Sequence, residues 1–330
     1  MGFYHYPTPL SGIPTDKVVE KYNGNNHKLN EQVLSNAKDF HNEIVESHLD
    51  VVEVPIKGKS VQIQTCHNIR SEVRNEKFVL MIHGLGGNLT HFEPLISRFS
   101  EDNTPFITLD LPGFGDSGNL DRYDMNDVTS VICELVYKVC HQHQFKSVDI
   151  IGHSMGCILA AHVSKKIKYK CAQLIFLGTP PMENKALQNP LVRLILKLLW
   201  FFPGIFDFYR VKFDQSKGLD SSGIRKFYYR SGNTYGKLYQ FYRNIQIKSK
   251  TLVGYFLGWH DVQLSELNAD VPIHLIHGDK DEVCTLEKLQ KWTRLENSTL
   301  DVIPDCSHNC LLDATSETLE LINKYLQIGK

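Results

Sequence analysis

The sequence lacks a hydrophobic run long enough to cross a membrane. Its apolar stretch 191–202 has only twelve residues and already holds Arg193 and Lys197, whereas a membrane-spanning helix needs roughly 20 apolar residues. An excess of charge is lacking too: 36 Lys and Arg face 37 Asp and Glu, for a net charge of -1. This balance gives no reason to expect nucleic acid as a partner.

Cysteine pairs and targeting signals are also lacking. The eight cysteines include no C-x-x-C pair, and the N-terminus has no basic stretch followed by an apolar one. We therefore expect neither secretion nor an oxidising compartment. No arginine precedes Arg70, which argues against a mitochondrial transit peptide, and the last residues form no peroxisomal or prenylation signal. A cytoplasmic protein is expected.

Short apolar runs alternate with helical patterns along most of the chain. Such runs are typical of strands buried on both faces of a parallel sheet, and the alternation indicates a layered α/β fold. Two alternating runs, 51–56 and 61–66, predict a hairpin, and 29–49 has the spacing of an amphipathic helix. The expected buried strands are 78–82, 106–109, 148–151, 174–177, 272–276 and 300–303, and the further helices are 92–99, 125–143, 155–166, 286–294 and 317–326.

One interval, 183–260, interrupts this alternation and is too long for a simple crossover. It holds 17 of the 34 aromatic residues, and its 13 Lys and Arg against 4 Asp and Glu leave a net charge of +9. The remainder of the chain therefore carries about -10. We expect this interval, called here the inserted segment, to be a separate helical piece with its own task.

The strongest motif is Gly152-His153-Ser154-Met155-Gly156, which follows an expected strand and precedes an expected helix. In this context G-x-S-x-G forms a sharp turn that exposes the serine hydroxyl at the carboxyl edge of the sheet. The N–H of Met155, at the start of the helix, points to the same spot. Ser154 is the expected nucleophile, against the alternative of a glycine turn with an idle serine.

A base and an acid are expected on two later loops. His308 follows the last expected strand and can fold back over the sheet edge toward Ser154. Between the two in chain order, the strand 272–276 leads to Asp279 and Asp281. We choose Asp281 as the acid that orients the imidazole, with Asp279 as a rival that is better suited to forming a turn.

A fourth element, His83-Gly84-Leu85-Gly86-Gly87, follows the strand 78–82. Glycines here let backbone N–H groups approach a developing oxyanion, and the N–H of Leu85 would pair with that of Met155. A tight loop without a ligand is the alternative. All four elements follow strand ends, the edge where open α/β sheets bind ligands.

These motifs, together with Asp110-Leu111-Pro112-Gly113-Phe114-Gly115-Asp116-Ser117, resemble the α/β-hydrolase superfamily, in particular its capped serine hydrolases such as esterases and monoacylglycerol lipases. The resemblance implies a mostly parallel twisted sheet with helices on both faces, an inserted helical cap, and a triad that works without a cofactor or metal. It divides the chain into an N-terminal extension, a core and a cap: 1–49, 50–182 with 261–330, and 183–260. Members of the branch that open epoxides carry Asp where this chain has Ser154.

Three other patterns were weighed. The glycines 113, 115 and 118 match G-x-G-x-x-G, but no helix follows at once, as a dinucleotide fingerprint requires. Cys306, His308 and Cys310 are too crowded for a known zinc spacing. His308 and Asp313 match H-x-x-x-x-D, a spacing associated with acyltransferases, which leaves transfer to an alcohol or thiol as an alternative to hydrolysis.

The inserted segment indicates an acyl-chain or lipid ester as substrate. Its stretch 191–202 is either a buried cap helix or a lid that lies on a membrane or lipid-droplet surface, with Arg193 and Lys197 on one basic face. Aromatic side chains of the segment suit an apolar acyl pocket; the candidates are Trp200, Phe201, Phe206, Tyr228 and Tyr229. A non-catalytic binding protein on a hydrolase fold is the alternative from another functional class.

Overall fold

An eight-stranded sheet forms the centre of the protein. The computed structural model describes residues 42–69, 76–215, 217, 221–230 and 234–328. The sheet order is β1-β2-β4-β3-β5-β6-β7-β8. The strands are β1 (Leu49–Ile56), β2 (Lys59–His67), β3 (Lys77–Ile82), β4 (Phe106–Leu109), β5 (Ser147–His153), β6 (Lys170–Leu177), β7 (Ile273–Gly278) and β8 (Ser298–Ile303).

Most strands of the sheet are parallel, and the central ones are buried. β1 and β2 pair antiparallel, as the predicted hairpin requires, and β2 also runs antiparallel to β4. From β4 to β8 all neighbouring strands are parallel, and β3, β4 and β5 are buried along almost their whole length. Strands covered on both faces can be apolar throughout, which is why their runs stand out in the sequence. The predicted α/β fold is confirmed.

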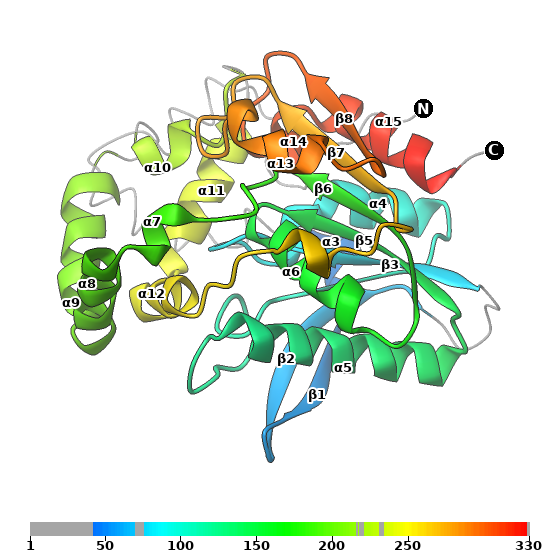
Figure 1. Cartoon of the computed structure of the whole chain (residues 1–330), viewed down its shortest axis with the longest axis horizontal. Helices are drawn as coiled ribbons and strands as arrows, with labels where there is room; N and C mark the ends of the chain where they lie inside the picture. Colours follow the sequence, from blue (N-terminus) through cyan, green and yellow to red (C-terminus); the bar gives the residue numbers. More distant parts are fainter. Residues whose placement is uncertain (1–41, 70–75, 216, 218–220, 231–233, 329–330) are drawn as a thin grey trace.

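Helices cover both faces of the sheet (Figure 1). On one face α5 and α6 pack against each other and against β1, β5 and β6. On the other, α4 and α15 bury apolar side chains against the opposite side of the strands. These helices and the smaller core elements are η2 (Leu89–Phe92), α3 (Glu43–Glu46), α4 (Glu93–Glu101), α5 (Met125–His143), α6 (Met155–Lys166), η5 (Leu264–Glu266), η6 (Leu286–Leu289), α13 (Gln290–Thr293), α14 (Cys310–Asp313) and α15 (Thr315–Leu326).

The inserted segment is helical, and its helices gather at one end of the sheet, on the left in Figure 1. α8 packs on α12, and α9 contacts both of them. The elements are α7 (Lys185–Gln188), α8 (Pro190–Phe201), α9 (Pro203–Tyr209), the π-helix η3 (Arg210–Asp214), α10 (Ser222–Arg225), α11 (Thr234–Gln246) and α12 (Ser249–Leu257).

The outer side of α8, α9 and η3 is exposed and apolar. In α8 only Leu196 is buried, so this helix does not serve as a buried cap helix. Arg193 also departs from the expected basic face, because its guanidinium donates to the carbonyl oxygen of Leu257, 3.2 Å away. We call the exposed side chains of this surface the outer apolar face: Leu191, Leu194, Ile195, Leu198, Phe201, Phe202, Ile205, Phe208, Tyr209, Val211 and Phe213.

Two predicted helices need comment. The segment 286–294 forms a 3-10 turn followed by one short helix instead of a continuous helix. Of the helix predicted over 29–49, residues 29–41 lie outside the described part of the chain, and Glu43–Glu46 is helical. Among the described helices, none combines the length and the apolar character that a membrane span requires.

Candidate active site

Ser154 occupies a sharp turn between β5 and α6. Its backbone has φ 51° and ψ -123°, a region that side-chain-bearing residues rarely adopt. A Cβ atom at Gly156 would lie 2.1 Å from the carbonyl oxygen of Ile82, so only glycine allows α6 to approach β3 this closely. The turn expected from the motif is therefore present, and it presents Ser154 to the cavity described below.

His308 and Asp281 meet beyond the carboxyl ends of β8 and β7. The Nδ1–H of His308 donates to Asp281 Oδ2 at 2.8 Å, and His308 is only 1% exposed. The other oxygen, Oδ1, accepts from the backbone N–H groups of Val283 and Cys284 at 2.8 and 2.7 Å. Burial alone would raise the pKa of Asp281, but the hydrogen bond and the charge of His308 hold this pKa below its ordinary value. Asp281 is thus poised as a carboxylate.

The rival carboxylate, Asp279, faces elsewhere. Its Oδ2 accepts from the ammonium of Lys280 at 2.8 Å, and its Oδ1 accepts from the backbone N–H of Cys306 at 3.4 Å. These contacts fit the turn-forming role that was its alternative. Of the two carboxylates, Asp281 is the one that contacts His308.

The loop after β3 lies directly against the serine turn. A Cβ atom at Gly84 would lie 2.9 Å from the Cβ atom of Ser154. The loop is held by His83, whose Nδ1–H donates to the carbonyl oxygen of Gly84 at 2.7 Å and whose Nε2 accepts from the N–H of Leu111 at 2.9 Å. Because one ring nitrogen accepts, the ring must be neutral, and burial indeed lowers the pKa of His83 to about 4.

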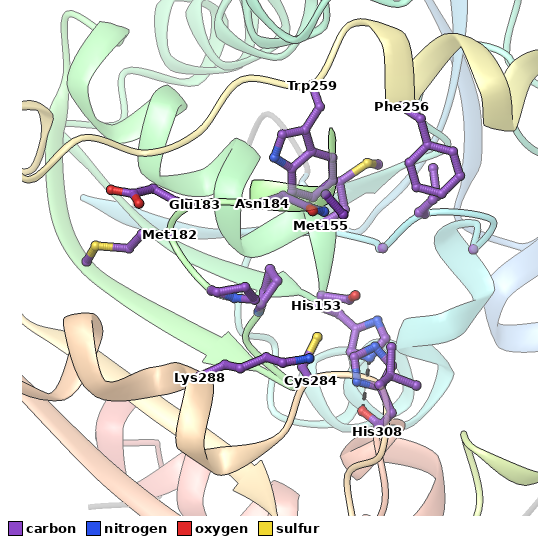
Figure 2. Close-up of a pocket in the computed structure, with 18 of the residues that line it drawn as sticks. His153, Met155, Met182, Glu183, Asn184, Phe256, Trp259, Cys284, Lys288 and His308 are labelled. Carbon is purple, nitrogen blue, oxygen red and sulfur yellow. Dashed lines mark hydrogen bonds between the residues drawn. The ribbon is translucent and has the colours of Figure 1, made fainter. Parts of the chain in front are cut away.

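A cavity of about 740 Å³ opens in front of these groups. Figure 2 shows the rings of His153 and His308 close together, with Phe256 and Trp259 on one side and Lys288 on the other. The predicted residues on its wall are Leu85, Ser154, Met155 and His308, and the further lining residues include Gly84, His91, His153, Pro180, Pro181, Met182, Phe227, Gln240, Phe256, Trp259, Val283, Cys284 and Lys288. Asp281 stands behind His308.

The aromatic wall differs from the one expected. None of the five candidate aromatic residues lines the cavity; Phe227, Phe256 and Trp259 do so instead. Phe201 and Tyr229 are exposed. The sequence alone could show that the segment is rich in aromatic residues, but the direction of each side chain depends on how its helix packs.

Two histidines were missed by the sequence analysis. His153, inside the serine motif, donates from Nε2 to the carbonyl oxygen of His308 at 3.2 Å. His91 stacks on His153 with ring centroids 4.1 Å apart, and burial lowers the pKa of His91 to about 3. The position of His153 beside the serine was a usable signal, whereas no motif marks His91.

The remaining patterns find structural explanations. A Cβ atom at Gly115 would lie 1.9 Å from Asp110 Oδ2, so this glycine of G-x-G-x-x-G makes room for a buried carboxylate. The thiols of Cys306 and Cys310 are buried and both contact the carbonyl oxygen of Ser307. In the described part of the chain, the Asp313 carboxylate accepts hydrogen bonds from backbone N–H groups.

Comparisons with known proteins identify the family of the chain. The family described as alpha/beta hydrolase fold matches residues 77–315. The chain is 33% identical to Lipid droplet hydrolase 1 of Saccharomyces cerevisiae over 344 aligned residues, which cover 92% of this chain and 91% of that protein.

Solved structures support the same fold at lower identity. An esterase of Exiguobacterium antarcticum superposes with a TM-score of 0.65 at 18% identity, over 84% of this chain and 99% of its own. A bacterial membrane phospholipase A superposes with a TM-score of 0.62 at 16% identity, over 94% of both chains. The resemblance found in the sequence is confirmed: the chain belongs to the α/β-hydrolase family, as an enzyme of the esterase and lipase type.

Proposed function

We propose that this chain is a serine hydrolase that cleaves acyl-chain or lipid esters through a Ser154–His308–Asp281 triad. The observation that carries the proposal is that Ser154 and His308 lie on the wall of the same cavity, with Asp281 Oδ2 2.8 Å from Nδ1 of the imidazole. A hydroxyl, a base and an orienting carboxylate are the groups that acyl transfer to serine requires. Residues 183–260 act as the cap of this enzyme, 50–182 and 261–330 as its core, and 1–49 as an N-terminal extension.

The reaction has two halves. Ser154 Oγ attacks the ester carbonyl carbon while His308 Nε2 takes its proton, since Nδ1 is already bound to Asp281. The oxyanion rests on the N–H groups of Leu85 and Met155, and the imidazolium then protonates the departing alcohol. Water, deprotonated by His308, attacks the acyl-enzyme and releases the carboxylic acid and the free serine.

The cavity favours an apolar acyl group. Its size falls in the range of small-molecule sites, which are mostly apolar with a few polar groups. Phe256 and Trp259 supply an apolar wall above the imidazoles in Figure 2, and Met182 lines the cavity farther away, beside Glu183. A relative named as a lipid droplet hydrolase, similar along nearly its whole length, supports the same substrate class.

The outer apolar face suits contact with a lipid surface. Eleven large apolar side chains between 191 and 213 are exposed, with Lys197 and Lys212 exposed among them. Apolar side chains that enter the acyl boundary while cations meet anionic headgroups are the features of an interfacial helix. We infer that the enzyme is cytoplasmic and binds the surface of a membrane or lipid droplet from that side.

A series of p-nitrophenyl esters from acetate to palmitate tests the substrate class. We expect kcat/KM to rise from acetate to at least octanoate, because each added methylene enters apolar surroundings. Turnover confined to acetate and butyrate would contradict the acyl-chain proposal. Hydrolysis and acyl transfer share the acyl-enzyme and differ in the acceptor that attacks it. Adding an alcohol and measuring the new ester therefore separates the two reactions.

A further inference from the structure

The loop that carries His308 is bonded on both sides to the inserted segment. Before it in the chain, the Ser307 hydroxyl donates to the carbonyl oxygen of Lys226 at 2.6 Å. After it, the Asn309 N–H donates to the carbonyl oxygen of Phe227 at 3.2 Å. The expected base is thus flanked by residues that the inserted segment holds in place.

Asp313 joins the same two pieces of chain with one carboxylate. Oδ2 accepts from the backbone N–H groups of Ser307 and Tyr229 at 2.8 and 3.0 Å, and Oδ1 accepts from that of Arg230 at 3.2 Å. The residue is only 5% exposed. Hydrogen bonds to a carboxylate are stronger than neutral ones, so this side chain is the firmest described link between the inserted segment and the His308 loop.

The linked stretch of the inserted segment also contacts His308 and the cavity. The ring of Phe227 lies edge-on to the His308 ring, with centroids 5.4 Å apart, and Phe227 lines the cavity. His153 of the serine turn donates to the carbonyl oxygen of His308, and the centroids of the two rings lie 5.0 Å apart. Residue 308 is therefore contacted by both the serine turn and the inserted segment.

We propose that Asp313 is a positioning residue: by binding Ser307, Tyr229 and Arg230 together, it makes the placement of His308 depend on the inserted segment. The inference rests on the proposed role of His308 as base. This role also explains the H-x-x-x-x-D spacing of His308 and Asp313, because it lets the carboxylate on α14 bind the backbone N–H of Ser307. A substrate that fills the cavity against Phe227 presses on the same assembly.

The substitution Asp313→Asn tests this role while keeping the shape of the side chain. The amide retains one oxygen, but its NH2 group turns donors toward backbone N–H groups that need an acceptor, which costs the bonds and pushes the loop away. A shift of about 1 Å in a catalytic group can cost about 100-fold in rate. We therefore expect kcat for p-nitrophenyl butyrate to fall by about 10- to 100-fold, with KM changed less than about threefold, because the cavity wall persists.

Glu317→Gln is the matched control. Glu317 accepts from the Arg230 guanidinium at 2.9 Å and is half exposed. Its replacement removes one negative charge from the same neighbour but leaves the Asp313 bonds, and the bonds of Arg230 to the carbonyl oxygens of Pro304 and Asp305, in place. We expect kcat and KM within about twofold of the native values, as for a surface ion pair. Thermal midpoints are measured for both variants, so that any unfolded fraction is corrected, and the rate of fluorophosphonate labelling reports separately on the activation of Ser154.

Ser307→Ala decides the matter if the Asp313 variant does not fold. It removes only the bond to Lys226, and we expect kcat to fall about 2- to 10-fold, while the loss of one ordinary hydrogen bond lowers the thermal midpoint only slightly. If the Asp313→Asn protein folds and keeps the native kcat, the inference is overturned. If that variant does not fold, a native kcat in the Ser307→Ala protein overturns it. Ester turnover that persists in the folded Ser154→Ala variant would overturn the proposed function instead.

Discussion

At the scale of single residues, Asp281 is surrounded by donors that hold it as a carboxylate. His277 is completely buried; its Nε2 is hydrogen-bonded to the carbonyl oxygen of Cys284 at 2.5 Å and lies 3.2 Å from the same Oδ2 that accepts from His308. Val283 and Cys284 bind the other oxygen through their N–H groups. A carboxylate with these hydrogen bonds is fixed in orientation. It fixes in turn the tautomer of His308, whose Nε2 is the nitrogen that takes the serine proton in the proposed mechanism.

Replacing Asp281 by Asn should therefore impair catalysis far more than binding. The amide offers His308 a different partner and destabilises the imidazolium, for which a loss of about 10³- to 10⁴-fold in kcat is expected from serine hydrolases. Asp279→Asn, two residues earlier and bonded to Lys280, should change kcat less than about threefold. Steady-state kinetics on p-nitrophenyl butyrate compare the two. Equal losses in both variants would contradict the assignment of Asp281.

Buried histidines near the site make stability depend on pH. His91 has a pKa lowered by burial from 6.5 to about 3, and its Nε2 has no hydrogen-bond partner among the described residues. As the pH falls through about 6.5, His91 is protonated in the unfolded chain but stays neutral in the folded protein. The folded state therefore loses stability as the pH falls below about 6.5, by about 1.4 kcal/mol per pH unit for this one residue.

The variant His91→Phe should reduce that slope. Phenylalanine keeps an aromatic ring against His153 and takes up no proton, so its stability relative to the native protein should improve by about 1.4 kcal/mol for each pH unit below 6.5. Urea unfolding between pH 7.5 and 4.5 measures this difference. The exposed His141, replaced by Gln, serves as control and should leave the slope unchanged; parallel curves for the native protein and His91→Phe would refute the account.

At the scale of elements, the sequence predicted best what local chemistry determines. The buried strands β3, β4 and β5 stand out because nearly every residue in them faces apolar surroundings. The serine turn was predictable because G-x-S-x-G has one structural reason in that context. The segment 286–294 was predicted less well: its apolar spacing is helical, yet the chain forms a 3-10 turn and a single helical turn, since short segments take their form from packing.

The apolar sequence of α8 shows the limit of such predictions. Hydrophobic content alone cannot distinguish a helix buried on all sides from one that presents an apolar face outward. The structure leaves Leu198 and Phe201 51% and 74% exposed. Eleven exposed apolar side chains within 191–213 are the reason for the proposed contact with a lipid surface.

Charges placed on the outer apolar face should weaken lipid binding and leave ester hydrolysis nearly unchanged. We expect the double variant Leu198→Glu, Phe201→Glu to bind phosphatidylcholine–phosphatidylserine vesicles at least about 10-fold more weakly in flotation assays, because two apolar side chains no longer enter the acyl region. Activity on soluble p-nitrophenyl butyrate should stay within about twofold. The control carries Leu300→Glu and Val302→Glu on β8, equally charged and distant from the face; loss of binding in both would point to general repulsion.

At the scale of the whole molecule, charge and chemistry are divided between two regions. The inserted segment has a net charge of +9 and the remainder about -10, so an anionic surface attracts one side of the enzyme and repels the rest. In the proposed function, that arrangement would turn the outer apolar face toward lipid. Cavity and apolar face both belong to this end of the molecule, because α7 and α12 contribute to the cavity and α8 packs on both.

The candidate site itself was largely predictable, because strand ends in an open α/β sheet share one edge. Ser154, Leu85 and His308 could be assigned to it from their places after three strands. The partners that come from side-chain packing could not: His91 and Phe227 reach the cavity from elements whose orientation no motif determines. The same holds for Asp313, whose spacing from His308 was visible but whose partners lie in the inserted segment.

The most direct test is covalent labelling with a fluorophosphonate, followed by peptide mapping. The account predicts one labelled residue, Ser154, with labelling and ester turnover both lost in Ser154→Ala and reduced by several orders of magnitude in His308→Ala. Label on another serine, or turnover that survives Ser154→Ala, would contradict the triad, and a folded protein that takes up no label would be a binding protein on a hydrolase fold.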